Sequence, residues 1–151
     1  MKHTIDIQNA CDAEKIPTIE FFQEWVNTAL MSVTEKEFEL TIRLVNIAES
    51  QALNNQYRQK NKPTNVLSFP FEVPEGIELN LLGDLVICAQ VVEEEAKAQN
   101  KALFDHWAHM VIHGCLHLLG YDHINDSDAN EMESLEVKIL AKLTIANPYN
   151  M

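Results

Sequence analysis

The sequence predicts an α+β (mixed α/β) domain in which a small mixed four-stranded sheet is covered by about five helices. Short runs alternate between polar and apolar residues, as half-buried strands do, and longer runs repeat apolar residues at helical spacing. Together these runs predict the order β, α, β, α, β, β, α, α, α. With 151 residues and no internal repeat or low-complexity linker, we expect a single domain over residues 1–151.

The first half of the chain predicts two strands and two helices. The strands are 3–8 (HTIDIQ) and 38–44, the clearest alternation in the chain, and the helices are 17–31 and 46–59. The second helix gathers four residues on one side: Ala48, Ala52, Leu53 and Tyr57. Pro63 and the Asn and Thr residues around it prevent this helix from continuing.

The second half predicts two strands followed by three helices. The strands are 66–71 and 81–88, and Pro70 indicates that the first of them lies at a sheet edge or ends there. The helices are 89–100, 103–119 and one that ends near Leu143, which Asp126 or Ser127 would cap. We expect the C-terminal tail, ANPYNM, to be loose.

Composition excludes several classes of function. The formal net charge of −12 argues against a non-specific nucleic-acid binder, and no DNA partner is expected. No apolar run is long enough to cross a bilayer, no secretion signal is seen, and three widely spaced cysteines suit reduced thiols, so we expect a cytoplasmic protein without a membrane partner. The one cationic cluster consists of Arg58, Lys60 and Lys62.

The stretch HGCLHLLGYDH carries the strongest chemical pattern. His113 and His117 are one helical turn apart, and Gly120 lets the chain leave the helix so that His123 can return to the same point. Three imidazoles without an obvious fourth ligand are typical of an open, catalytic metal site. We expect one Zn²⁺ per chain, although another divalent transition metal would also suit imidazole ligands.

One position separates this stretch from the zinc-protease pattern HExxHxxGxxH. Gly114 occupies the place where those proteases carry the glutamate that acts as general base. The pattern therefore predicts a metal site without a proteolytic base. Two blander interpretations remain: hydrogen-bonded histidines on a buried helix face, and a structural zinc, for which Cys115 is badly placed.

The residues around this stretch each admit more than one role. Asp122 suits the orientation of a ligating histidine, or a turn cap, better than direct ligation. His109 lies one turn before His113 and could donate a proton, contact a phosphate or form a supporting hydrogen bond. We expect His106 at the surface, and Asp84 either faces the site or caps a turn.

A metal-activated nucleophile attacks a carbonyl or a phosphorus, and the cationic cluster bears on that choice. A guanidinium matches the charge of a phosphodiester transition state, so Arg58, with Lys60 and Lys62, could hold an RNA backbone. Arg43, the other arginine, lies on the polar side of its strand. The alternative is a solvated helix end, where positive charge is favoured in any case.

Three segments closely resemble the YbeY family of bacterial rRNA-maturation endoribonucleases: YRQKNKPTNVLSFPFE (57–72), LLGDLVIC (81–88) and HWAHMVIHGCLHLLGYDH (106–123). The resemblance implies a metal-dependent endoribonuclease that prefers single-stranded RNA and acts in 16S rRNA 3′-end maturation and ribosome quality control. It also implies zinc on His113, His117 and His123, a functionally important Arg58, and a ribosomal or small-subunit partner.

The predicted catalytic residues are therefore Arg58 and His113, with Lys60, Lys62 and His109 as further RNA contacts. The nucleophile is either a water or the RNA 2′-OH, and the sequence does not choose between them. A metallohydrolase of another class, such as a protease or amidase, and a non-catalytic ribosome-assembly factor with a structural zinc are the alternatives.

Overall fold

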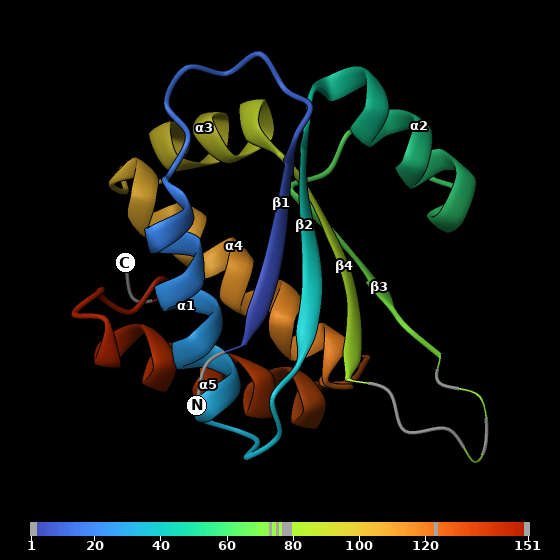
Figure 1. The fold of residues 1–151 in the computed structure, drawn as a ribbon. Coiled ribbons are helices and arrows are strands. Elements are labelled where there is room, and N and C mark those ends of the chain that lie inside the picture. The colour runs from blue at the N-terminus through green and yellow to red at the C-terminus, as the bar shows by residue number, and fades with distance from the viewer. Residues whose placement is uncertain (1–2, 73, 75, 77–79, 123, 150–151) are drawn as a thin grey trace.

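The computed structural model describes residues 3–72, 74, 76, 80–122 and 124–149. Its elements follow the predicted order (Figure 1). They are β1 (Thr4–Asn9), α1 (Ile19–Met31), β2 (Glu39–Val45), α2 (Ile47–Arg58), β3 (Val66–Pro70), β4 (Leu81–Cys88), α3 (Ala89–Ala98), α4 (Leu103–Leu118) and α5 (Asp126–Lys142). The α+β prediction, with four strands and five helices, is confirmed for this part of the chain.

The four strands form one mixed sheet in the order β1-β2-β4-β3. β1, β2 and β4 are parallel, and β3 runs antiparallel to β4 at the edge. Pro70 ends β3 opposite Gly83, in agreement with the edge position predicted from the proline. At Gly83, φ is +146°, and a Cβ atom would lie 2.3 Å from the Phe69 carbonyl oxygen, so only glycine fits this close pairing.

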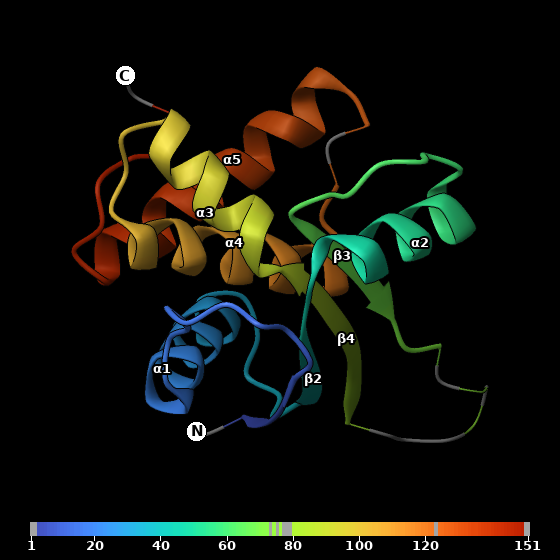
Figure 2. The same ribbon diagram turned by 90° about the horizontal axis from the view of Figure 1, so that it is seen from above.

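The two faces of the sheet are covered unequally: α1, α4 and α5 pack on one face, and α2 packs on the other (Figure 2). Leu85 points into the main core, which contains residues of α1, α4 and α5, whereas Val86 points to a small cluster with Leu53 of α2. Successive strand residues face opposite sides, so this alternation places α4 and α2 on opposite faces of the sheet.

Helix α4 is the most deeply buried element and ends within one residue of its prediction. Trp107 is fully buried and meets Phe22 of α1 edge to face, with ring centroids 5.8 Å apart. The packing of α4 against both α1 and the sheet fixes the register of every side chain that it carries. In the described ranges, no helix is long and apolar enough to cross a membrane.

One local expectation was wrong, and α2 buries polar side chains. Asn125, rather than Asp126 or Ser127, caps α5, and its side chain accepts a hydrogen bond of 2.8 Å from the Asp128 backbone N–H. In α2 the buried side chains are polar Ser50 and Asn54. They bond the backbone carbonyls of Thr64 and Lys62, so this helix holds the following loop through hydrogen bonds.

Candidate metal centre

Four imidazoles form a row along one side of α4. His106, His109, His113 and His117 follow one another at three- or four-residue spacing, and successive ring centroids lie 6.1, 6.3 and 4.6 Å apart. The expectation that His106 lies at the surface was wrong, because its exposed fraction is 2%. Its Nε2 lies 2.9 Å from a carboxylate oxygen of Glu95, a half-buried side chain that provides a polar partner.

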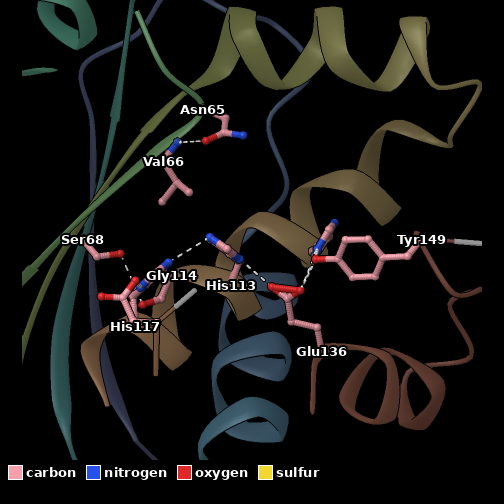
Figure 3. A network of polar contacts seen from close by, with 10 residues as sticks. Asn65, Val66, Ser68, His113, Gly114, His117, Glu136 and Tyr149 are labelled. Atoms are coloured by element: carbon pink, nitrogen blue, oxygen red, sulfur yellow. Dashed lines mark hydrogen bonds and ion pairs between the residues drawn. The ribbon is translucent and has the colours of Figure 1, made fainter. Parts of the chain in front are cut away.

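His113 and His117 converge as the motif predicts. Their Nε2 atoms are 3.1 Å apart, and both side chains are partly exposed (Figure 3). Two nitrogens that bind one tetrahedral zinc at ordinary bond lengths lie about 3.3–3.4 Å apart. The pair thus fits two adjacent positions of a zinc site with only a small adjustment.

The third predicted ligand, His123, lies outside the described residues. Within the described residues, no group of three His, Cys, Asp or Glu side chains is arranged to hold a metal ion. Asp122 approaches the site from the loop after α4, with its Oδ1 4.0 Å from His117 Nδ1. This position suits the predicted orienting role of Asp122, and the three-histidine set stays a prediction.

Glu136 of α5 is the residue that sequence reasoning missed. Its side chain is fully buried, and its Oε1 lies 2.5 Å from His113 Nδ1. The other oxygen, Oε2, lies 3.3 Å from His109 Nε2 and accepts a hydrogen bond from the Tyr149 hydroxyl. A signal was present, because Glu136 interrupts the buried stripe of α5: Met132, Ile139 and Leu140.

The Glu136 carboxylate is a charged group held inside the protein. Burial alone would raise the pKa of Glu136, but hydrogen bonds from His109 and His113 outweigh burial and lower this pKa to about 2. A carboxylate at Nδ1 favours the His113 tautomer with its proton on that nitrogen, which leaves a lone pair on Nε2. This orientation agrees with the predicted role of His113, in which Nε2 would bind the metal.

His109 belongs to the supporting network. Its exposed fraction is 7%, its Nε2 lies near Glu136, and its ring meets Tyr149 edge to face. This geometry corresponds to the hydrogen-bonding alternative. Direct RNA contact by His109 stays a prediction, and the burial of the ring leaves little surface for it.

Gly114 has a packing role as well as a chemical one. A Cβ atom at this position would lie 2.6 Å from a methyl carbon of Leu85, because α4 here approaches β4 closely. The Gly114 carbonyl also accepts a hydrogen bond of 3.4 Å from the Ser68 hydroxyl. A side chain at position 114 would point into the core, so a general base could not reach the site from there.

The cationic cluster lies on another part of the molecule. Arg58 is the last residue of α2, and Arg58, Lys60 and Lys62 are exposed. The core contacts place α2 and α4 on opposite faces of the sheet, so Arg58 and His113 are carried by helices on opposite faces. Arg43 is engaged elsewhere, because its Nε lies 2.6 Å from Glu49.

Asp84 does not face the site, which corrects one of its two predicted roles. It is exposed and lies on the same face of β4 as Val86, opposite Leu85, which contacts α4. There it lines a surface hollow with Thr41, Phe69 and Tyr57. Because successive side chains of a strand point to opposite faces of the sheet, Asp84 and the imidazoles lie on opposite faces.

Comparisons with known proteins agree with this architecture. A family model described as endoribonuclease YbeY matches residues 6–144. An endoribonuclease YbeY from Colwellia psychrerythraea is 67% identical over 152 residues, which cover 99% of this chain and 98% of that protein. The solution structure of the Thermotoga maritima protein TM1509 has a TM-score of 0.65 at 28% identity, covering 93% of this chain and 89% of that one.

Proposed function

We propose a function from one premise: the chain belongs to the YbeY endoribonuclease family. On that premise it cleaves single-stranded RNA in the maturation of the 16S rRNA 3′ end and in ribosome quality control. Its place of action is the cytoplasm, and its partners are the ribosome or small-subunit proteins. The observation that carries the proposal is the convergence of His113 and His117, with Nε2 atoms 3.1 Å apart, within the chain region that matches the family.

His113, His117 and His123 would hold one zinc ion. The fit rests on the spacing of the first two Nε2 atoms and on the carboxylates near their Nδ1 atoms, which are those of Glu136 and Asp122. When bound, zinc supplies Lewis-acid chemistry, which favours attack at a phosphodiester by withdrawing negative charge from its oxygens. The protein's part is to fix the imidazoles, since Glu136 is buried and holds the His113 ring.

Arg58 would bind the RNA backbone, with Lys60 and Lys62 beside it. A guanidinium offers paired donors to a phosphate, and the cluster follows directly on the C-terminal end of α2. Because α2 and α4 flank opposite faces of the sheet, an RNA strand that engages both would pass the β3 edge. A single-stranded substrate can follow such a bent path, which a stiff duplex cannot.

The alternatives have less support. A protease or amidase would need a general base. Gly114 has no side chain to act as one, and any side chain placed at position 114 would point at Leu85. A purely structural zinc is usually enclosed by four protein ligands. The side chains of His113 and His117 are 25% and 21% exposed, which fits an open site better than the structural zinc of an assembly factor. The net charge of −12 suits an enzyme that binds RNA through one confined cationic cluster.

Cleavage of a labelled single-stranded RNA by the purified protein tests the proposal. We expect the wild type to cut it, His113→Ala to lose at least about 100-fold in rate and Arg58→Ala to lose about 10- to 100-fold. Arg43→Ala, which removes the only other arginine, is the matched control and should retain activity. Equal cutting by all four proteins would mean contamination and would sink the assignment.

The chemical ends of the product distinguish the two nucleophiles. A 2′,3′-cyclic phosphate indicates attack by the RNA 2′-OH, and a linear 5′-phosphate indicates attack by water. A parallel reaction with the same sequence in a duplex tests the single-strand preference, which predicts little or no cutting of the duplex.

A further inference from the structure

The C-terminal tail is fastened to the candidate metal centre, although the sequence predicted a loose tail. The Tyr149 hydroxyl donates a hydrogen bond to Oε2 of Glu136 (Figure 3). The Tyr149 ring meets His109 edge to face, with centroids 5.5 Å apart and planes at 89°. Tyr149 as a whole is 44% exposed, so burial of the residue does not explain its position.

The tail also has a local reason for its conformation. The Tyr149 backbone N–H donates a hydrogen bond of 2.8 Å to the Asn147 side chain, which forms a turn that directs the ring inward. Burial and the neighbouring Glu136 carboxylate both raise the pKa of Tyr149, so its hydroxyl stays protonated and remains a donor. Glu136 thus receives a donor from a segment far from α4 in the chain.

We propose that Glu136 and Tyr149 are positioning residues for His113, so that the zinc affinity of the site depends on the C-terminal tail. This inference rests on the zinc site proposed above. Glu136 holds His113 Nδ1 directly, whereas Tyr149 acts one step further away by fixing the Glu136 carboxylate. Neither residue would touch the substrate.

Hydrogen-bond geometry indicates what loss of the hydroxyl would do. Without it, Glu136 Oε2 keeps only the longer contact of 3.3 Å to His109. The buried carboxylate would then be less well satisfied, and it would hold the His113 ring less firmly. The Tyr149→Phe variant isolates this effect, because it removes one oxygen atom and keeps the ring against His109.

Zinc affinity, measured by competition with a chromogenic chelator, tests the inference without reference to RNA cleavage. We expect Glu136→Gln to weaken zinc binding by about 10- to 100-fold and Tyr149→Phe by about 3- to 10-fold. Two matched controls keep wild-type affinity: Glu94→Gln, an exposed acid on α3, and Tyr57→Phe, an exposed ring on α2.

A spectroscopic readout separates positioning from general stability. In the cobalt(II)-substituted protein, Tyr149→Phe should alter the visible absorption bands, which report ligand geometry, while the thermal midpoint of the metal-free protein stays unchanged. If Glu136→Gln fails to fold, Tyr149→Phe still tests the positioning role. Tyr149 is a partly exposed tail residue, so we expect this variant to fold.

Each outcome identifies the idea that fails. Zinc binding by Tyr149→Phe within twofold of wild type, with an unchanged cobalt spectrum, would overturn the positioning role and leave the proposed function intact. A wild-type protein that binds zinc as predicted but cuts no RNA would overturn the proposed function alone. A wild-type protein that binds no zinc would overturn the metal site and the inference that rests on it.

Discussion

Helix α4 carries two imidazole–carboxylate pairs that look alike but differ in which ring nitrogen is used. In the pair of His106 and Glu95, the carboxylate meets Nε2, and Nδ1 is buried without a hydrogen-bond partner in the described structure. In the pair of His113 and Glu136, the carboxylate meets Nδ1, and Nε2 faces His117. Only the second pair leaves a nitrogen in a position to bind a metal.

The comparison shows that a close His–Glu pair does not by itself mark a functional site. The His106 pair joins α4 to α3, and Glu95 also accepts a hydrogen bond from Asn65, which precedes β3. It therefore holds three segments together. In the proposed metal site, the His113 pair would use the same chemistry to orient a ligand, because Nε2 of His113 lies toward His117.

Metal removal should give the largest difference between the two pairs. Treatment with a strong chelator should abolish RNA cleavage by the wild type, a loss of at least about 100-fold, and added zinc should restore it. The matched variant His106→Gln should behave like the wild type, because Gln can still donate to Glu95. In His117→Ala, added zinc should not restore cleavage. Full activity of the chelated wild type would refute the metal role.

Close packing beneath the His113 pair gives the next largest effect. Gly114→Ala would place a methyl group 2.6 Å from Leu85, and we expect a loss of about 1–3 kcal/mol in the free energy of unfolding. Urea denaturation measures this loss. In the double variant with Leu85→Val, the loss should fall below the sum of the two single losses, and strict additivity would argue against the contact.

The His106 pair should contribute to stability and not to zinc binding. Burial raises the pKa of Glu95, but hydrogen bonds from His106 and Asn65 outweigh it and lower this pKa overall. A lowered carboxyl pKa contributes stability above the unfolded-state value, and this stability is lost as the pH falls through the folded-state value. Glu95→Gln should therefore lower stability by about 1–2 kcal/mol at neutral pH and reduce its loss in acid. Unfolding curves at pH 7 and pH 4 check this, and a weaker zinc affinity would contradict the assignment.

The cap of α5 should give the smallest effect. Asn125→Ala removes the bond to the Asp128 backbone N–H and should cost about 1 kcal/mol. Because α5 carries Glu136 about three turns after the cap, zinc affinity should stay unchanged. Thermal unfolding measures the first effect and chelator competition the second, and an undiminished stability would show that the cap is dispensable.

Local patterns were sufficient for most of the fold. Alternation over 38–44 and helical spacing over 103–119 depend on neighbours in the chain, and both segments form as predicted, within a residue or so at their ends. The pairing of His113 with His117 was predictable for the same reason, because residues four apart share a helix face.

Long-range pairing was not predictable in the same way. Glu136 is 23 residues from His113, and nothing near either residue indicates that α5 folds back against α4. One of the two roles predicted for Asp84 was wrong. The sequence did not show whether Asp84 or Leu85 is the strand residue that meets α4. His106 was misplaced because its partner, Glu95, lies on another helix.

Zinc titration of two matched variants tests the central claim most directly. The claim is that the nitrogen used by the carboxylate decides which pair belongs to the metal site. His106→Gln should bind one zinc with wild-type affinity, whereas His113→Gln should lose at least about 100-fold in affinity. Equal zinc binding by the two variants would contradict the claim, because it would mean that His113 is no more a ligand than His106.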